Sequence, residues 1–516
     1  MKLIIFFIGL CFSLSVKAQH PNWQNKDLES DSVFGISTEK AYSTLLKQEK
    51  AKTVLVAVID GGVDTAHEDL KSVIWINPGE TFNGIDDDHN GYVDDLHGWD
   101  FIGGPGGDVQ YENLELTRLI RKEHSLYDSL PSSEVPDQYR KMKADYNKRL
   151  AQAQGVVNRI SMLKGILDSM TQKIGKENPT MEDFQNYQPA NDHEKSIKQV
   201  VLNQLGRNPD FSAFKKEIDD GVKHFKIVLD YQLNLSYDPR SIVGDNIQDS
   251  VQRNYGNNDV TGPDANHGTH VSGIIGAVRN NNIGINGIAD HVEIMSVRVV
   301  PDGDERDKDV ANGIRYAADN GAKVINMSFG KAYSPNKSVV DEAVKYAMTK
   351  DVLIVHAAGN DGENLDSSYN FPNRRYTDGG EAGAWIEVGA SGEKNDSTLA
   401  ASFSNYGKTS VDVFAPGVQI YSSTPGSHYE YFSGTSMASP VVAGLAALIR
   451  EYYPKLTALQ VKDIILKSVV KVDHPVFVKD GSGKKELVPF SAICVSGGVV
   501  NVYNALQLAK HYKKNK

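Results

Sequence analysis

The feature that most constrains the fold is a set of short, almost wholly apolar segments rich in β-branched residues. The first is TVLVAVID, and the set occupies residues 53–60, 323–330, 351–360, 385–391 and 410–417. Such runs are typical of strands that are buried on both faces. Segments with helical spacing lie between them, at 310–321 and 338–350. Strands that alternate with helices predict an α/β fold built on a parallel sheet.

Residues 105–255 break this alternation. From Tyr139 to Ile174 the apolar residues recur at spacings of three and four, which predicts one long amphipathic helix or a helical hairpin. The segment from Phe211 to Leu229 repeats the pattern. Glycine-rich stretches, GGPGGD and NYGNND, bound the region. We therefore expect an α-helical subdomain at 105–255, inserted between a first part of the main domain at 19–104 and its remainder at 256–516.

The N-terminus has the pattern of a signal peptide. Lys2 precedes an apolar run from Leu3 to Val16, and Val-Lys-Ala then suits cleavage after Ala18. An uncleaved membrane anchor is the alternative, although the run is shorter than the ~20 residues that span a bilayer. We predict a signal peptide at 1–18, a mature chain without a membrane span, and an extracytoplasmic location, secreted or periplasmic. Cleavage leaves Cys494 as the one cysteine, so no disulfide can form within the mature chain.

The charge balance argues against one class of partner. The 516 residues carry a formal net charge of −11, and the sequence contains no cluster of basic residues to offset it. A nucleic-acid-binding surface needs a positive patch. We therefore expect no nucleic-acid partner.

Three residues capable of acyl-transfer chemistry lie at ends of predicted elements. Asp60 closes the first strand, where parallel sheets usually bind ligands. His267 opens the segment HGTHVSGIIGAV, and Ser436 lies in GTSMASPVVAGLAALI, a turn that enters an apolar helix. Pro440 is expected in the first turn of that helix, where N–H groups lack partners. Taken singly, Asp60 could be a turn residue and Ser436 a helix N-cap, while His267 and His270 could bind a metal from one helix face.

The chemistry joins these residues into one mechanism. A serine hydroxyl needs a base to take its proton during attack, and a neutral imidazole such as that of His267 suits this role. Asp60 can hold the imidazole in one tautomer and stabilise its cation. Attack on an amide creates an oxyanion, to which Asn360 in AAGN and the backbone N–H of Ser436 can donate.

Seven segments carry a resemblance to a known family. They are VIDGGVD, HGTHVSGIIG, SFG, AAGN, FSNYG, FAPG and GTSMASP. With the chain order Asp, His, Ser, they resemble the subtilisin-like serine peptidases, or subtilases, over residues 50–104 and 255–510. The resemblance implies a doubly wound, mostly parallel sheet and an exported serine endopeptidase that hydrolyses polypeptides through an acyl-enzyme. In that mechanism Ser436 is the nucleophile, His267 the general base, Asp60 its orienting partner and Asn360 the oxyanion donor.

The same resemblance implies a binding edge for an extended peptide. Ser328, Phe329 and Gly330 would pair with the substrate backbone on one side, and Ala357, Ala358 and Gly359 would lie opposite. Phe329 could equally be a core aromatic.

An acidic loop, NGIDDDHNGYVDD at 83–95, predicts a calcium site. Crowded hard oxygen ligands about an Asn-Gly turn suit this ion. The candidate ligands are Asp86, Asp88, Asn90, Tyr92 and Asp94, with Asp95 in the same crowded group. It is not an EF-hand, because the twelfth position counted from Asp86 is His97 rather than Glu. A solvated acidic hairpin turn is the alternative.

Two departures from the family pattern leave alternatives open. The helical insertion separates Asp60 from His267, and we hypothesise that it covers the cleft, limits substrate access or binds a protein partner; a side appendage without catalytic effect is the other possibility. Residues 19–52 are too few for a folded inhibitory prodomain. The alternative function is that of a catalytically silent relative that binds peptides or partners. An esterase is disfavoured, because the sequence lacks the G-x-S-x-G turn expected of that fold.

Overall fold

The computed structural model describes residues 21–479 and 483–514 and divides them into two compact units. Residues 21–116 and 238–514 form an α/β unit, and residues 117–237 form a helical unit. The helical unit is narrower than the insertion expected at 105–255. The predicted signal peptide at 1–18 lies outside the described residues.

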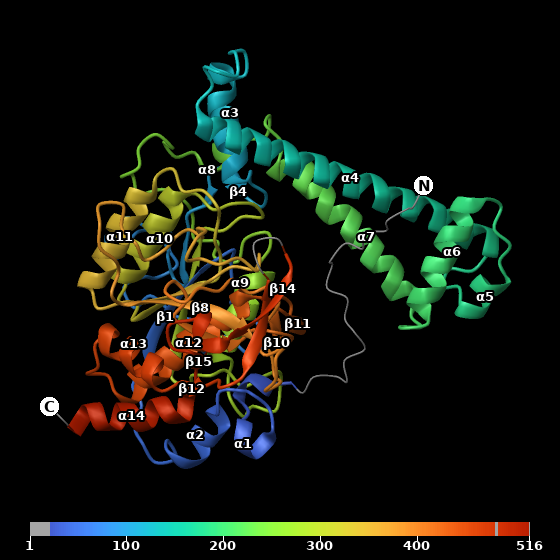
Figure 1. Ribbon diagram of the computed structural model, residues 1–516. Helices are drawn as coiled ribbons and strands as arrows, with labels where there is room; N and C mark the ends of the chain where they lie inside the picture. Colours follow the sequence, from blue (N-terminus) through green and yellow to red (C-terminus); the bar gives the residue numbers. More distant parts are fainter. Residues whose placement is uncertain (1–20, 480–482, 515–516) are drawn as a thin grey trace. The chain divides into compact units, whose positions relative to one another are not determined.

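A central sheet organises the α/β unit (Figure 1). Its nine described strands follow the order β12-β15-β9-β8-β7-β6-β1-β5-β2. Neighbouring strands pair in parallel, except β12 with β15. The strands are β1 (Val54–Asp60), β2 (Gly98–Asp100), β5 (Val292–Arg298), β6 (Val324–Met327), β7 (Leu353–Ala357), β8 (Trp385–Ser391), β9 (Val413–Pro416), β12 (Val470–Lys471) and β15 (Gly498–Val499). The mostly parallel α/β sheet is therefore confirmed.

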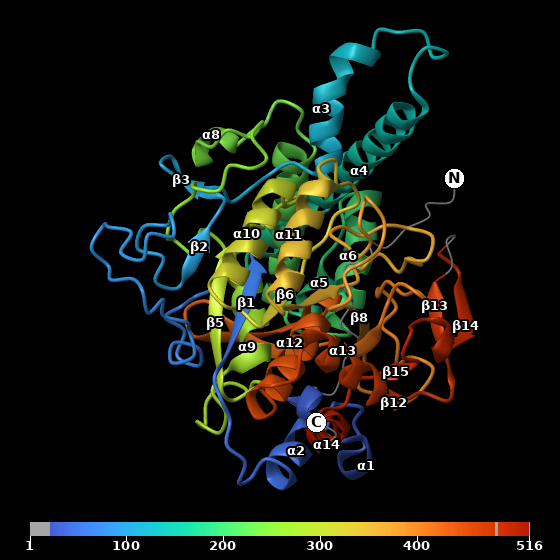
Figure 2. The same ribbon diagram turned by 90° about the vertical axis from the view of Figure 1, so that its left-hand side faces the viewer.

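Helices cover both faces of the sheet. Side chains alternate along each strand, so a strand made of apolar residues presents an apolar surface on both faces. In β1, Val54, Val56 and Val58 enter one apolar cluster, and Ala57 and Ile59 enter another. The first cluster includes residues of α9 (Asn266–Gly276), α12 (Thr435–Tyr452), α13 (Ala458–Lys467) and α14 (Val502–Lys514). The second includes α10 (Asp307–Asp319) and α11 (Lys337–Thr349), which lie side by side (Figure 2). This arrangement is the doubly wound fold that the sequence predicts.

Shorter elements complete the α/β unit. Three two-stranded hairpins and several short helices join the main elements. They are β3 (Gly103–Gly104) with β4 (Gly107–Asp108), β10 (Ile420–Thr424) with β11 (His428–Phe432), β13 (Pro475–Lys479) with β14 (Lys485–Pro489), η1 (Trp23–Asn25), α1 (Leu28–Asp31), α2 (Thr38–Thr44), α8 (Arg240–Val243) and η3 (Phe490–Ala492). The stretch GGPGGD, expected to end the main domain, thus forms the β3–β4 hairpin within it.

The chain leaves and re-enters the α/β unit near one guanidinium. Arg306 pairs with Glu112, at 2.7 Å, and with Asp238, at 3.4 Å. Arg240, in the re-entering segment, donates two hydrogen bonds of 2.7 and 2.8 Å to Asp309 of α10. The two ends of the excursion are therefore held close together within the α/β unit itself.

The helical unit has its own core. Residues Tyr139 to Ile174 belong to a single helix, α4 (Asp137–Ile174), about 57 Å long at 1.5 Å per residue. Gly175, with φ of 74°, ends this helix. The other elements are α3 (Glu115–Tyr127), whose first two residues belong to the α/β unit, α5 (Met181–Asn186), α6 (Asp192–Leu205), α7 (Phe211–Ile227) and the π-helical turn η2 (Val228–Gln232). The core consists of Ile160, Leu167, Met170, Phe184, Val201, Leu205, Phe211, Phe214 and Ile218.

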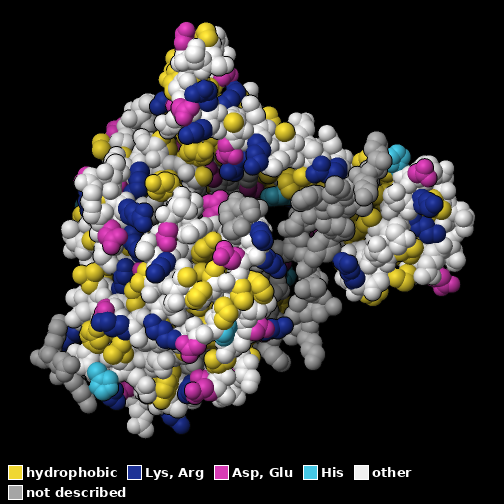
Figure 3. Space-filling model, viewed as in Figure 1, with side chains coloured by type: hydrophobic (Ala, Val, Ile, Leu, Met, Phe, Trp, Pro, Cys, Tyr) yellow, Lys and Arg dark blue, Asp and Glu magenta, His cyan; other side chains and the backbone are white. Residues whose placement is uncertain are grey.

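The surface mixes both signs of charge. On the face of the α/β unit shown in Figure 3, Lys and Arg side chains are interspersed with Asp and Glu. Within residues 21–479 and 483–514, no helix combines the length and the apolar character that crossing a membrane requires.

Candidate active site

The carboxyl end of β1 meets the start of α9. Asp60, the last residue of β1, is 2% exposed, and both of its carboxylate oxygens lie near Nδ1 of His267, at 2.8 and 3.0 Å. The same carboxylate accepts the N–H of Gly61 at 2.7 Å. A Cβ at position 268 would lie 2.2 Å from the carbonyl oxygen of Gly62, so glycine at this position lets α9 approach the strand end closely.

The Asp60 carboxylate sets the protonation of His267. Burial alone would lower the pKa of this imidazole, but the charge and hydrogen bond of Asp60, together with the charge of Asp264, raise the pKa above its ordinary value. The His267 side chain is 42% exposed, so it remains open to solvent and ligands. His270, one turn further on, differs: its Nε2 donates to the carbonyls of Ile420 and Glu430, and burial lowers its pKa to about 3. His270 is thus a structural residue of the α9–β10 packing.

Ser436 is the second residue of α12. Its hydroxyl donates to the carbonyl oxygen of Ser328 at 3.1 Å, and no hydrogen bond joins it to His267 among the described residues. A rotation about one side-chain bond would free this hydroxyl for another partner.

Pro440 lies deeper in α12 than the sequence indicated. It is the sixth helical residue rather than part of the first turn, so its missing N–H leaves the carbonyl of Ser436 without its helical donor. The hydroxyl of Ser328 fills the position, donating to that carbonyl at 2.9 Å. Asn326 in turn donates to the Ser328 hydroxyl at 3.0 Å and accepts from Ser439 at 2.7 Å. This network ties the start of α12 to the end of β6, and neither Asn326 nor Ser439 was singled out from sequence.

Asn360 follows β7 and has its side-chain amide fixed in direction. The amide oxygen accepts the backbone N–H of Thr435 at 2.9 Å and the Thr435 hydroxyl at 3.1 Å. The amide nitrogen therefore points away from Thr435. A Cβ built on Gly434 would lie 3.5 Å from that nitrogen, 3.7 Å from the amide oxygen and 3.6 Å from the backbone nitrogen of Ser436, so the Asn360 amide and the start of α12 are neighbours. Sequence reasoning missed Thr435, whose hydroxyl is the second holder of the amide.

A hollow of about 340 Å³ opens beside Ser436. Five of the six predicted substrate-binding residues line it: Ser328, Phe329, Gly330, Ala357 and Gly359. The sixth, Ala358, is fully buried, and its carbonyl accepts hydrogen bonds from Asn405 and Asn370.

A buried ion pair supports the segment that follows Asp60. Arg298, at the end of β5 and 2% exposed, donates to the carbonyl of Gly61 at 2.8 Å and to Asp100 at 2.6 Å. Burial raises the pKa of Asp100 to about 7, although the charge and hydrogen bond of Arg298 oppose the shift. Arg298 was missed from sequence because β5 was not recognised as a strand.

The acidic loop brings two of its predicted carboxylates, Asp88 and Asp95, together with Glu80, which precedes the loop. Glu80, Asp88 and Asp95 place one oxygen each within 4.8 Å of one another. Asp95 is fully buried, and burial raises its pKa to about 6 against hydrogen bonds from Tyr316, Asn77 and Asn90, with the charge of Asp88 raising it further.

Asp86, Asp94 and Tyr92, also predicted as ligands, have other contacts. Asp86 accepts the N–H groups of Asn90 and Gly91, at 3.1 and 2.8 Å. Asp94 accepts the N–H of Gly84 with both oxygens. The ring of Tyr92 packs in the core, 5.0 Å from that of Trp99. Two oxygens on opposite sides of one calcium ion lie about 4.8 Å apart, so the span of the three-carboxylate cluster suits this ion, and Glu80 is its member that the sequence did not indicate.

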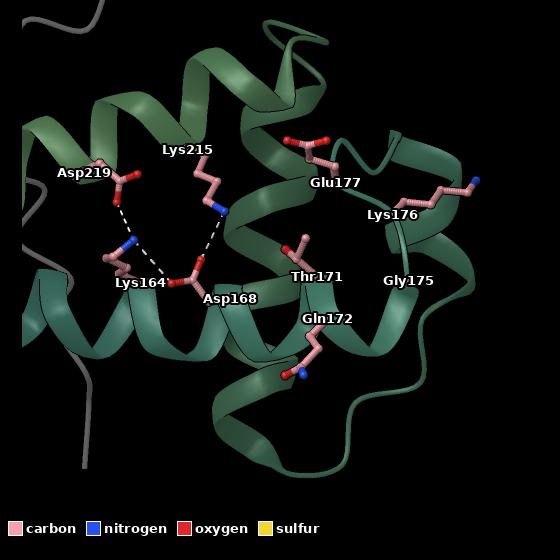
Figure 4. Close-up of a pocket in the computed structure, with 9 residues that line it drawn as sticks. All are labelled: Lys164, Asp168, Thr171, Gln172, Gly175, Lys176, Glu177, Lys215 and Asp219. Atoms are coloured by element: carbon pink, nitrogen blue, oxygen red, sulfur yellow. Dashed lines mark hydrogen bonds and ion pairs between the residues drawn. The ribbon is translucent and has the colours of Figure 1, made fainter.

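A second hollow, of about 610 Å³, lies in the helical unit (Figure 4). Lys164 pairs with Asp219 at 2.5 Å and Asp168 at 3.3 Å, and Lys215 pairs with Asp168 at 3.4 Å. Its lining contains neither Ser, His nor Cys. The groups suited to acyl transfer therefore lie in the α/β unit, beside the smaller hollow.

An Asp–His pair at a strand end, a serine near a helix start and nearby N–H groups are the kinds of group that serine hydrolases use. The model of the subtilase family matches residues 51–487, and the chain belongs to this family. The resemblance drawn from the seven segments is confirmed.

Individual relatives match a shorter part of the chain. A thermophilic serine proteinase from Bacillus sp. (strain AK1) is 46% identical over 185 residues, which is 36% of this chain and 42% of that protein. Subtilisin BL from Lederbergia lenta is 40% identical over 199 residues, 38% of this chain and 67% of that protein. Thermitase from Thermoactinomyces vulgaris is 46% identical over 194 residues, 37% of this chain and 64% of that protein. The chain thus spans between two fifths and two thirds of the length of these relatives.

One solved structure aligns along nearly the full length. It is a protease from Pseudoalteromonas arctica PAMC 21717, with 21% identity and a TM-score of 0.48 over 95% of this chain and 98% of the other.

Proposed function

We propose that this chain is a serine endopeptidase that hydrolyses polypeptides through an acyl-enzyme. The observation that carries the proposal is the pairing of His267 with the buried Asp60 carboxylate, beside a helix start that presents Ser436. Membership of the subtilase family and the names of the similar proteinases support the same reaction.

In this mechanism the Ser436 hydroxyl turns from the carbonyl of Ser328 toward His267. As its oxygen attacks the scissile carbonyl carbon, the proton passes to Nε2 of His267, and Asp60 stabilises the imidazolium. The backbone N–H of Ser436 and the amide of Asn360 donate to the developing oxyanion. His267 then protonates the leaving amine, and water, deprotonated by the same imidazole, releases the acyl group.

The extended substrate would lie along Ser328, Phe329 and Gly330, with Gly359 opposite. Main-chain pairing along this edge suits polypeptides of varied sequence. Ala358 would support this edge without contacting the substrate, because it is buried and its carbonyl accepts hydrogen bonds from Asn405 and Asn370.

The test compares the full chain with Ser436→Ala in cleavage of an unfolded protein substrate. Loss of the nucleophile in enzymes of this type lowers kcat by about 10⁶-fold. Ser433→Ala is a matched control, since this exposed hydroxyl accepts hydrogen bonds from the backbone and side chain of Gln419 and its loss should leave cleavage unchanged. Equal cleavage by wild type and Ser436→Ala would reject the mechanism. No cleavage by folded wild type would favour a catalytically silent, peptide-binding relative.

A structural calcium ion in the acidic loop is part of the proposal. The cluster of Glu80, Asp88 and Asp95 would hold it, with Asp86, Asn90, Tyr92 and Asp94 shaping the loop or completing the oxygen shell. The ion would neutralise the crowded carboxylates and stabilise the fold next to β2. At calcium 100 times its Kd the expected gain is about 2.7 kcal/mol of unfolding free energy.

Calorimetry with and without a chelator measures that gain. Asp88→Asn should remove most of the calcium-dependent rise in Tm. Asp87→Asn should retain it, because Asp87 bonds Thr81 and Asn83 outside the cluster. Equal calcium responses in both variants would place the ion elsewhere or exclude it.

We also propose export by the predicted signal peptide at 1–18. N-terminal sequencing of the secreted protein should find Gln19 as the first residue, and retention of residues 1–18 would contradict cleavage at Ala18.

The helical unit is proposed to limit access of large substrates or to bind a protein partner.

A further inference from the structure

A second group of ligand-type side chains lies far from Ser436, at the other end of α12. Asp290 and His291 precede β5, and Glu451 is the penultimate residue of α12. Glu451 lies fifteen positions after Ser436 in this helix, about 22 Å along the axis. Asp290, His291 and Glu451 each offer one ligand atom, and these atoms lie within 4.8 Å of one another.

The buried member of the group has an unused oxygen. Glu451 is 0% exposed, and its Oε1 accepts the backbone N–H of His291 at 3.2 Å. Its Oε2, also buried, has no hydrogen-bond partner. Burying a carboxylate oxygen without a donor is costly, so such an atom calls for a proton or a cation.

The neighbouring groups leave that demand unmet. Nδ1 of His291 lies 3.0 Å from Oδ1 of Asp290, and the hydroxyl of Tyr452 lies 3.5 Å from the same oxygen. The nearby guanidinium of Arg279 is bound to Glu39 at 2.9 Å and to the carbonyl of Gly287. Two carboxyl groups and one imidazole therefore converge, and the Arg279 guanidinium is bound to other partners.

We propose that Asp290, His291 and Glu451 bind a divalent transition-metal ion of the zinc type. An imidazole nitrogen with two carboxylate oxygens is a donor set that suits Zn²⁺ better than the all-oxygen ions calcium and magnesium. Neighbouring ligands of a tetrahedral zinc lie about 3.4 Å apart, so the observed group needs only small side-chain adjustments. The exposed side of His291, whose side chain is 49% accessible, provides the entry path and room for a water ligand.

Such an ion would join the start of β5 to the end of α12. These segments are 160 positions apart in sequence, and neither contains a cysteine that could cross-link them. The site would therefore stabilise the fold without taking part in peptide hydrolysis.

The alternative is a proton shared between the two carboxyl groups. Burial and the adjacent Asp290 raise the pKa of Glu451 well above its ordinary value, so the pair would hold a proton where no cation binds. The experiment separates these two states.

The test uses the full chain made inactive by Ser436→Ala, so that self-cleavage does not interfere, with calcium in excess to occupy all-oxygen sites. Zn²⁺ binding is measured by competition with a chromophoric chelator, and Tm by calorimetry. We expect tight binding of one ion and a Zn²⁺-dependent rise in Tm. His291→Ala and Glu451→Gln should each weaken binding by about 10-fold or more. His511→Ala, which removes an exposed imidazole on α14, is the matched control and should bind as the parent does.

Crystals soaked in Zn²⁺ should show anomalous scattering beside His291. Equal binding by His291→Ala and His511→Ala would mean adventitious zinc and overturn the proposal. The proposal would also be overturned if the parent protein retained no zinc and Glu451→Gln raised Tm. That result is expected if the two carboxyl groups share a proton. Because neither readout requires turnover, failure here would leave the proposed peptidase activity untouched.

Discussion

The direction of the Asn360 amide depends on Thr435, and this dependence can be tested by substitution. Thr435→Val removes the hydroxyl that donates to Asn360 Oδ1 at 3.1 Å and accepts the N–H of Gly359 at 3.1 Å. The backbone N–H of Thr435 still holds Oδ1, at 2.9 Å. The variant therefore loosens the proposed oxyanion donor without removing it.

The expected loss follows from these contacts. One neutral hydrogen bond contributes about 0.5–1.5 kcal/mol, so weakened positioning should lower kcat by about 2- to 10-fold. Asn360→Ala removes the donor itself and sets the upper bound, about 10²- to 10³-fold. KM should change little, because the amide acts mainly on the transition state. Thr435→Ser keeps the hydroxyl and should restore most of the rate.

Steady-state kinetics on a short peptide, with the double variant, provide the assay. If Thr435 acts through Asn360, Thr435→Val should have little further effect once Asn360 is alanine. An equal loss in both backgrounds would show that Thr435 acts by another route. A change confined to KM would show that the hydroxyl serves substrate binding instead.

Three further predictions concern the surroundings of the site. Because Asp60 raises the pKa of His267, kcat/KM should fall as pH drops through a value above about 6.5. Asp60→Asn should lower kcat by about 10⁴-fold and move this fall in kcat/KM to lower pH. A fall at the same pH in both proteins would contradict the role of Asp60 beside His267. Arg298→Met leaves Asp100 buried without its cation and should lower the free energy of unfolding by about 3–5 kcal/mol, measured with denaturant. Adding Asp100→Leu should recover part of that loss. Full stability of Arg298→Met alone would refute the stabilising role of the ion pair. Replacing residues 117–237 by a short Gly-Ser linker should leave the α/β unit folded and raise the rate on a large protein relative to a short peptide, and an unchanged ratio would reject the access hypothesis.

The elements predicted most successfully were those with strong local patterns. The apolar run ending at Asp60 became β1, and the three-and-four spacing from Tyr139 became the single helix α4. β5 was missed because Glu293, Ser296 and Arg298 interrupt its apolar run. Arg298 is nevertheless buried there, since Asp100 and two backbone carbonyls satisfy its guanidinium, and such partners cannot be inferred from the strand alone.

The candidate site divides in the same way. Motifs and their order indicated Asp60, His267, Asn360 and Ser436. The supporting contacts were not predictable, because they join residues remote in sequence. Thr435, for example, holds an amide 75 positions away. The position of Pro440 within α12 likewise depends on a distant hydroxyl, that of Ser328, to satisfy the carbonyl of Ser436.

The central claim, that Ser436 is a nucleophile activated by His267, is tested most directly by covalent labelling. The folded full-length protein would be treated with a fluorophosphonate, and the modified residue located by mass spectrometry. The mechanism predicts a single adduct on Ser436, absent in Ser436→Ala and strongly slowed in His267→Ala. Labelling of wild type at another serine, or none at all in protein shown to be folded, would contradict it.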